Sequence, residues 1–182
     1  MTYLTRISGW GNYPQQEAQL LTPFSCSSLT ALIRQEETLI ARGMGRSYGD
    51  SANAPKVLQI SYCDHFIEFD ESTGKLTAEA GITLKEILKV ILPKGWFLPV
   101  TPGTSYVTLG GAIASDVHGK NHHIDGSFGN HVCHLLLLDG RGEIHELTPN
   151  GNGNPDDSEI FWATVGGMGL TGAILEAKFK LI

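Results

Sequence analysis

The segment Pro102–Asn130 constrains this chain more than any other part of the sequence, because it combines frequent glycine with three histidines. The glycines stand at positions 103, 110, 111, 119, 126 and 129, and the histidines at positions 118, 122 and 123. No apolar run in the segment is long enough to form a buried core of its own. Glycine has no side chain, so its backbone takes positive φ angles and approaches a ligand closely. The segment is therefore predicted to wrap a ligand, first of all a large phosphorylated cofactor.

A second glycine-rich loop spans Ala41–Ser51 (ARGMGRSYGDS) and follows a predicted strand over Thr38–Ala41. Its glycines at 43, 45 and 49 let successive backbone N–H groups form a concavity that suits a diphosphate. The loop is not a P-loop, because the Gly-Lys-Ser/Thr ending is missing, and its spacing is not that of a Rossmann fingerprint. Taken alone, an ordinary tight loop explains it equally well. Two such loops that converge on one ligand are harder to explain by the requirements of folding alone than a single loop is.

Thr108, followed by Leu-Gly-Gly-Ala-Ile, predicts the start of a helix within the first segment. The partial positive charge at a helix N-terminus suits a phosphate group. The histidines allow a competing interpretation as metal ligands, since His118 and His122 are four residues apart. Gly119 and Gly126 interrupt that helix, and no carboxylate or thiolate pattern completes the ligand set, so no metal is expected. A nucleophilic triad is disfavoured too, because there is no G-x-S-x-G motif and no cysteine in an activating context.

Composition limits the remaining classes of function. The 182 residues suffice for one domain or two small lobes, and 41% of them are hydrophobic. A net charge of −6 argues against nucleic acid or an anionic membrane as the partner. Three irregularly spaced cysteines indicate reduced thiols, and the N-terminus lacks the apolar core of a signal peptide. We expect a cytoplasmic protein without a membrane span.

The pattern of secondary structure is α+β, with parallel-type units first and antiparallel hairpins later. Residues 2–13 are expected to form an arm across the surface, and Ser27 or Ser28 to cap a short helix. The clearest helix follows Thr83, which forms a capping box with Glu86, and ends at Pro93 and Gly95. Asp157 or Ser158 is expected to cap a later helix. The predicted strands are Thr38–Ala41, Val57–Ile60, Phe66–Asp70, Lys75–Ala80, Val132–Leu138, Glu143–Leu147 and Ala173–Ile182.

Four segments together carry a resemblance to a known family: ARGMGRSYGDSA, TPGTSYVTLGGAIASDVHGKNHH, GSFGNHV and FWATVGGMGLTGAI. They resemble the FAD-binding domain (PCMH type) of the vanillyl-alcohol-oxidase superfamily, and within it the bacterial decaprenylphosphoryl-β-D-ribose 2′-oxidase group. The resemblance covers nearly the whole chain. It implies a two-lobed α+β domain over residues 1–182. A smaller α/β lobe is expected over about residues 1–100, and a larger lobe with a mostly antiparallel sheet over about residues 101–182. FAD is expected to extend between the two lobes.

The resemblance also implies which residues form the site. The diphosphate and flavin would be held by both glycine-rich loops, and Gly172 and Ile174 would lie near the adenosine end. His118 and Lys120 are the candidate catalytic residues. The complete set of implied cofactor-binding residues is Arg42, Gly43, Met44, Gly45, Arg46, Ser47, Tyr48, Gly49, Ser51, Pro102, Gly103, Thr104, Thr108, Gly110, Gly111, Ser115, Val117, His118, Gly172 and Ile174.

The implied activity is oxidation of a sugar hydroxyl by hydride transfer to FAD, as part of cell wall biosynthesis. Arg46 stands where related oxidases carry a histidine linked to the flavin, so non-covalent FAD is expected. The family has a further substrate domain, absent from this chain, which would supply the main catalytic groups and bind a sugar or lipid-linked sugar. A reductase or epimerase partner and a place near the inner membrane face follow from the same resemblance. An aldonolactone or alditol oxidase and a binding-only flavin module are the alternatives.

Overall fold

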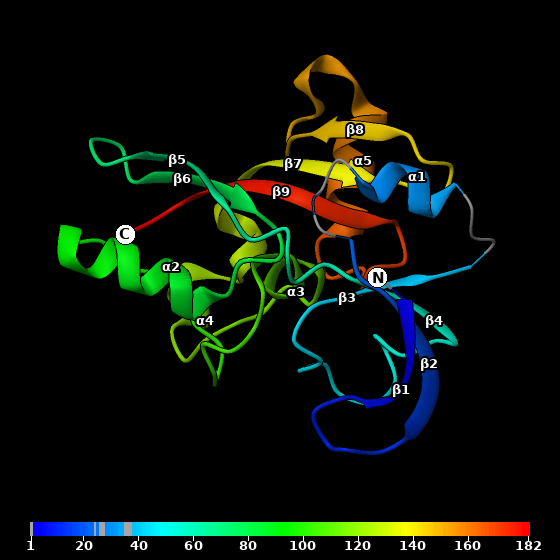
Figure 1. The fold of residues 1–182 in the computed structure, drawn as a ribbon. Coiled ribbons are helices and arrows are strands. Elements are labelled where there is room, and N and C mark those ends of the chain that lie inside the picture. The colour runs from blue at the N-terminus through cyan, green and yellow to red at the C-terminus, as the bar shows by residue number, and fades with distance from the viewer. Residues whose placement is uncertain (1, 24, 26–27, 35–37) are drawn as a thin grey trace.

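The computed structural model describes residues 2–23, 25, 28–34 and 38–182, which form two β-sheets with short helices packed against them (Figure 1). The first sheet has the strand order β1-β2-β4-β3. Its strands β1 and β2 are antiparallel, whereas β4 runs parallel to both β2 and β3. The bounds of these strands are β1 Thr2–Ser8, β2 Gln15–Leu21, β3 Ile40–Arg42 and β4 Lys56–Gln59.

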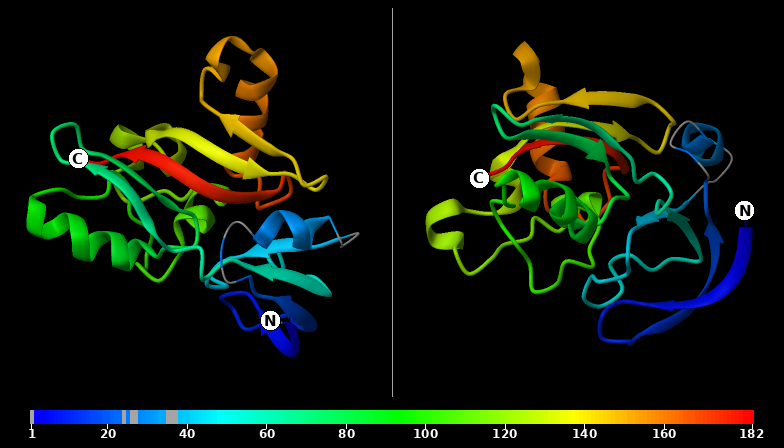
Figure 2. Two further views of the ribbon diagram at one scale, coloured as in Figure 1. Left: turned by 45° about the horizontal axis from the view of Figure 1, so that its top comes forward. Right: turned by 60° about the vertical axis from the view of Figure 1, so that its left-hand side comes forward.

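The second sheet has the order β5-β6-β9-β7-β8, and every neighbouring pair in it is antiparallel. Figure 2 shows the first sheet (blue to cyan) lying to one side of this larger sheet. Its strands are β5 Phe66–Asp70, β6 Lys75–Glu79, β7 Val132–Leu138, β8 Ile144–Leu147 and β9 Ala173–Lys180. The helices are α1 Leu29–Ile33, α2 Leu84–Ile91, α3 Leu109–Ala114, α4 His122–Asp125 and α5 Pro155–Thr164, with 3₁₀ turns η2 Leu92–Lys94, η3 Phe128–His131 and η4 Gly151–Gly153.

The mixed α+β class predicted from the sequence is confirmed. The chain passes from the first sheet to the second between Gln59 and Phe66. The first sheet therefore uses a shorter part of the chain than the 100 or so residues that the sequence analysis gave to the first lobe. None of the helices in the described ranges is both long enough and apolar enough to cross a lipid bilayer.

Helix α2 forms as its sequence predicts. Thr83 Oγ1 accepts a hydrogen bond from the backbone N–H of Glu86 at 3.2 Å, and the Glu86 carboxylate accepts one from the N–H of Thr83 at 3.0 Å. The hydroxyl of Thr83 also donates to Glu86, and these bonds lower the pKa of the Glu86 carboxyl. Gly95 ends the following turn in a left-handed conformation with φ of 82°.

Three expectations from the sequence need correction. Residues 2–8 are a strand of the first sheet rather than an arm across the surface, and β2 was not predicted. Helix α5 begins at Pro155 with Asn154 as its N-cap, not at Asp157 or Ser158, because proline favours the first helical position. Ser28 holds the N-cap position of α1, as expected, but its hydroxyl donates to the carbonyl of Ser25 and accepts no hydrogen bond from the helix. Ser27 lies outside the described residues.

The main core joins both sheets. Leu58 of β4 and Leu29 of α1 belong to the same buried cluster as Leu76, Leu135 and Phe179 of the larger sheet. The segment Pro102–Asn130 contributes to this core as well, through fully buried residues of α3 and η3 that include Leu109, Ile113 and Phe128. A second, smaller cluster packs on the other side of the first sheet and consists of Ile7, Ala18, Leu20, Ile40 and Val57.

Candidate cofactor site

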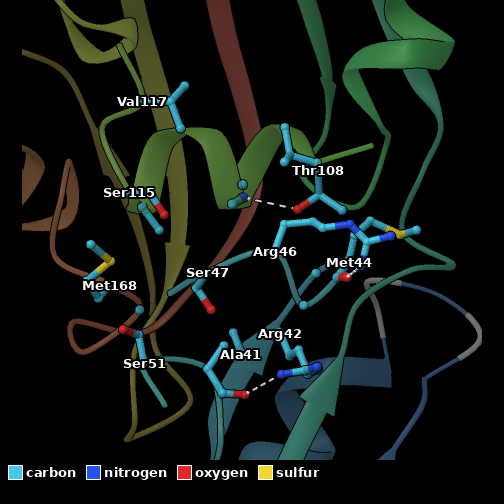
Figure 3. A pocket seen from close by; sticks show the side chains of 18 of the residues that line it. Ala41, Arg42, Met44, Arg46, Ser47, Ser51, Thr108, Ser115, Val117 and Met168 are labelled. Atoms are coloured by element: carbon cyan, nitrogen blue, oxygen red, sulfur yellow. Dashed lines mark hydrogen bonds between the residues drawn. The ribbon is translucent and has the colours of Figure 1, made fainter. Parts of the chain in front are cut away.

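A cavity of about 620 Å³ lies where the two sheets meet. Its wall is formed by the loop after β3, by the segment that contains α3, and by the turn between α5 and β9 (Figure 3). Cavities of roughly 300–1,000 Å³ are typical of small-molecule and cofactor sites. The two glycine-rich stretches singled out in the sequence therefore face one another across a single cavity.

The two stretches touch at Gly43 and Thr108. A Cβ atom on Gly43 would lie 2.3 Å from Thr108 Oγ1, so only glycine allows the loop after β3 to approach α3 this closely. The side chain of Gln59 donates to the carbonyl of Gly43 at 2.8 Å and holds the start of the loop on β4. This contact sets the distance between the two sides of the cavity.

The turn between β1 and β2 packs on the outside of the same loop. A Cβ atom on Gly9 would lie 2.4 Å from the carbonyl oxygen of Gly49 and 2.5 Å from that of Ser47. The N–H of Trp10 donates to Ser47 O at 2.8 Å, and the Trp10 ring reaches the cavity wall. Trp10 was not predicted as a site residue; the one signal the sequence offers for this contact is the tryptophan between two glycines in Gly9-Trp10-Gly11.

Arg42 holds the loop from inside. Its guanidinium donates to the carbonyl of Ser8 at 2.6 Å, to the carbonyl of Ala52 at 3.0 Å and to Asn53 Oδ1 at 2.8 Å. Partial burial lowers the pKa of this arginine, and the nearby positive charge of Arg46 lowers it further. Arg42 thus supports the loop through neutral oxygen atoms, while its positive charge remains at the cavity wall.

Helix α3 starts as predicted, with Thr108 as its N-cap, but its first N–H groups already have partners. The N–H of Leu109 donates to the carbonyl of Ile82, and that of Gly110 to the carbonyl of Ala80, both at 2.8 Å. The N–H of Gly111 donates to Thr108 Oγ1 at 3.1 Å (Figure 3). The interpretation of this helix start as a phosphate-binding N-terminus is therefore not supported. A Cβ atom on Gly110 would meet Ala80 at 3.0 Å, so this glycine serves close packing.

The loop after β3 is the better source of donors. Within the described parts of the chain, no backbone N–H of residues 44–51 donates a hydrogen bond to another residue. Gly45 and Gly49 have φ angles of 63° and 60°, which residues with a side chain rarely adopt. Ser47 Oγ is buried and has no hydrogen-bond partner among the described residues. A run of unused donors on a turning backbone is the arrangement that binds anions.

Nineteen of the twenty cofactor-binding residues that the sequence analysis named line this cavity. Gly49 lies in the loop but outside the wall, and Lys120 is exposed beyond it. Met168, which was not predicted from the sequence, lies between Ser115 and Ser51 at the left of Figure 3. Its φ angle of 53° is unusual for a residue with a side chain. The wall residues that were missed are Trp10, Ala41, Ala52, Ile60, Val107, Ala114, Thr164, Met168 and Gly169.

His118 lines the cavity and forms a bridge with Ser127 that closes the excursion containing α4. The rings of His118 and His122 lie edge to face, with 5.7 Å between their centroids. Among the described residues, the groups close enough together to share a metal ion are Asp64, His65 and Glu79, and Asp139, Glu143 and His145. Neither group includes a histidine of this excursion or a residue of the cavity wall.

Comparison with known proteins identifies the family of this domain. A family model described as "FAD binding domain" matches residues 25–148, a range that includes both glycine-rich stretches. The chain belongs to the FAD binding domain family. FAD is accordingly the cofactor of this domain.

The FAD binding domain is similar to several curated oxidases. It is 43% identical over 187 residues to decaprenylphosphoryl-beta-D-ribose oxidase of Mycolicibacterium smegmatis. This alignment covers 99% of the present chain and 40% of the relative. It is 24% identical over 157 residues to D-arabinono-1,4-lactone oxidase of Kluyveromyces lactis, covering 84% of this chain and 29% of the relative. The identity to L-gulonolactone oxidase 5 of Arabidopsis thaliana is 23% over 176 residues, and the alignment covers 93% of this chain and 29% of the relative. The chain thus spans two fifths or less of the length of these relatives.

The residues present fit FAD. The unused N–H groups of residues 44–51 and the unpartnered Ser47 hydroxyl are donors of the kind that a diphosphate accepts from. The close contact of Gly43 with Thr108 keeps both loops near enough to share one ligand. Apolar wall residues such as Val107, Val117 and Ile174 offer the surface that flat aromatic rings pack against.

Proposed function

We propose that this domain is the FAD-binding part of an FAD-dependent oxidoreductase that oxidises a hydroxyl group of a sugar. The observation that carries the proposal is the 43% identity to decaprenylphosphoryl-beta-D-ribose oxidase over 99% of the chain. The two sheets are the two lobes of a PCMH-type domain, and FAD lies extended between them. When bound, FAD would supply the acceptor for a hydride from the carbinol carbon of the substrate. The residues of this chain bind the cofactor, orient it and keep water from it.

Individual residues have distinct tasks in this proposal. The loop 44–51 binds the diphosphate through its N–H groups, and Gly172 with Ile174 lies near the adenosine. His118 lines the cavity, and Lys120, two residues further on, is exposed. These two side chains flank the sugar hydroxyl and help to hold its oxygen. The groups that bind the rest of the substrate and take its proton lie outside this chain.

The flavin is bound without a covalent bond, because Arg46 cannot attack the flavin methyl group as a histidine does. Its guanidinium is also engaged: it donates to the carbonyl of Met44 at 2.9 Å and lies 5.3 Å from the centroid of the Trp10 ring. Precipitation of the FAD-loaded protein with acid tests this point. All of the yellow colour is expected in the supernatant, and flavin retained in the pellet contradicts the proposal.

The activity itself is tested with the full-length protein. Anaerobic addition of a candidate phosphorylated or lipid-linked pentose should bleach the flavin absorbance, and a dye acceptor should restore it. Bleaching by aldonolactones together with rapid oxygen consumption favours the lactone-oxidase alternative, to which the identities of 24% and 23% point more weakly. A domain that binds FAD but shows no substrate-dependent bleaching is a binding-only module.

The setting of the reaction follows from the same proposal. The substrate is a sugar or lipid-linked sugar held by the part of the protein beyond this chain, and the keto product is passed to a reductase or epimerase. The enzyme works in the cytoplasm, close to the inner face of the membrane where a lipid-linked sugar is accessible. Co-purification of the full-length protein with such a reductase tests the partnership.

A further inference from the structure

A second cavity, of about 430 Å³, lies beside the FAD cavity on the side of β1. Five residues line both cavities, namely Trp10, Arg42, Met44, Gly45 and Arg46, whereas Arg6, Ile7, Ser8, Gly9 and Asn12 line the second alone. We call it the arginine cavity, because Arg6, Arg42 and Arg46 all contribute to its wall. These are three of the five arginines in a chain whose net charge is −6. Positive charge is therefore concentrated at this cavity in a protein whose net charge is negative.

The three positive charges are not neutralised by protein carboxylates. None of the three arginines forms an ion pair with another described residue, and none of the ten residues in the cavity wall is acidic. Glu17 stands opposite Arg6 in the β1–β2 register, yet both side chains are exposed and no ion pair joins them. Arg42 donates only to neutral oxygens, and Arg46 donates to a carbonyl and lies over Trp10.

The arrangement is held in place by contacts between the β1–β2 turn and the loop after β3. Gly9 packs against the carbonyls of Ser47 and Gly49, and Ser8 O accepts from Arg42 at 2.6 Å. Asn12 has a φ angle of 57°, and its side-chain oxygen accepts from the Ser8 hydroxyl at 3.1 Å. These bonds bring β1 and its turn against the loop after β3. Arg6 is thereby placed on the same cavity as Arg42 and Arg46, although it contributes nothing to the wall of the FAD cavity.

We propose that the arginine cavity binds a phosphate-class oxyanion at the same time as FAD occupies the larger cavity. Guanidinium groups match phosphate oxygens in geometry as well as charge, and several of them around one space favour an anion that carries more than one negative charge. The wall shared through Met44 and Gly45 places this anion next to the cofactor, while Arg6 lines the arginine cavity alone. The anion is either free phosphate or the phosphate group of a larger molecule.

The test uses FAD-loaded protein and inorganic phosphate, with sodium chloride at matched ionic strength as the reference. Trp10 is one of three tryptophans and lies under Arg46, so its fluorescence reports the site. Phosphate should change the fluorescence saturably, and Trp10→Phe should remove that signal. Arg6→Gln should weaken phosphate binding at least fivefold without changing FAD affinity. Arg141→Gln, the same change in the exposed β7–β8 turn, should leave phosphate binding unaltered.

Isothermal titration of the same variants provides a readout that is independent of tryptophan, and circular dichroism confirms that Arg6→Gln is folded. If phosphate raises the apparent dissociation constant of FAD in proportion to its concentration, the anion occupies the diphosphate site of FAD and the proposal is overturned. Equal phosphate affinity in Arg6→Gln and the wild type overturns it too. Glycerol 3-phosphate distinguishes the two sources: tighter binding than inorganic phosphate points to a larger phosphorylated molecule, and equal or weaker binding to free phosphate.

Discussion

The hydroxyl of Ser47 is buried and has no hydrogen-bond partner among the described residues. Substitution of Ser47 is therefore the most specific single-residue test of the FAD cavity. Ser47→Ala removes the desolvated group, so the FAD-free protein should be as stable as the wild type or more stable by about 1 kcal/mol. The same change should weaken FAD binding about three- to tenfold, which corresponds to the loss of one hydrogen bond. Thermal unfolding without cofactor and titration by flavin fluorescence measure the two effects separately.

A matched control is Ser105→Ala, since Ser105 is partly buried but does not line the cavity. It should leave FAD affinity unchanged. If Ser47→Ala destabilises the FAD-free protein and leaves FAD binding intact, the Ser47 hydroxyl serves the fold and does not contact the cofactor.

Gly43 offers a second prediction for a single residue, because its missing side chain sets the contact between the two loops. Gly43→Ala places a methyl group against Thr108 Oγ1 and should lower the free energy of unfolding by about 1–3 kcal/mol, as overpacking typically does. FAD affinity should fall in parallel, because the loops are pushed apart. Denaturant unfolding and FAD titration provide the measurements.

Two companion variants make the Gly43 result specific. Gly140→Ala is the control, since a Cβ atom there meets nothing within 4 Å, and it should change little. Thr108→Ala removes the clashing atoms but also the N-cap of α3, so the double variant should lose less stability than the sum of the single changes. Strict additivity would show that Gly43 and Thr108 do not interact.

Among the elements, the β5–β6 hairpin carries a clear pH dependence. Asp70 at the end of β5 accepts hydrogen bonds from the N–H and hydroxyl of Ser72, at 2.9 and 2.6 Å, and from the hydroxyl of Thr73 at 2.6 Å. These bonds lower the pKa of Asp70 from 3.8 to about 2. A carboxyl with a depressed pKa in the folded state stabilises the fold above its unfolded pKa and loses that contribution as pH falls through the folded value.

The predicted window therefore runs from about pH 4 down to about pH 2, between the unfolded and folded pKa values of Asp70. Asp70→Asn should be less stable than the wild type at pH 6, and the gap should narrow progressively across this window. Denaturant unfolding of both proteins at several pH values measures the difference in their free energies of unfolding. The contributions of the other acidic groups are the same in both proteins and cancel in this difference. A difference that stays constant down to pH 2 contradicts the role assigned to the carboxylate.

The elements that could be predicted from the sequence are those whose signals are local. The β5–β6 hairpin and α2 follow from a turn and a capping box, and both formed as expected. Strand β2 was not predicted because its first three residues, Gln15–Glu17, are polar and the alternation of apolar residues is weak. Only Ala18, Leu20 and Leu21 of this strand are buried. The use of the first N–H groups of α3 by Ile82 and Ala80 depends on tertiary contacts, which no local pattern contains.

The same distinction holds for the candidate site. Glycine-rich loops can be recognised by composition, so most of the wall was predicted. Small apolar residues such as Ala52, Ile60 and Ala114 line the cavity only because the fold brings them there, and nothing in their own sequence marks them. Met168 had a possible signal, since it is the residue with a side chain inside the run Gly166-Gly-Met-Gly169 and takes a positive φ angle.

At the scale of the whole molecule, the cofactor cavity is shared between parts that follow different sheets. The loop 41–52 continues from β3 of the first sheet, whereas α3 and the turn before β9 pack with the second. A ligand that contacts both sides adds its binding free energy to the cohesion of the two sheets. Because the main core already joins them, the ligand strengthens an existing arrangement and does not create it.

FAD should therefore raise the melting temperature in a concentration-dependent way. At a hundredfold excess over its dissociation constant a ligand stabilises the folded state by about 2.7 kcal/mol. For a domain of this size that corresponds to an increase of roughly 5–10 °C. FMN, which lacks the second phosphate and the adenosine, should give a much smaller increase at equal concentration, since it cannot reach both ends of the cavity. Equal shifts with FMN and FAD would mean that the loop 44–51 does not bind the diphosphate, and that the donors it presents serve another ligand.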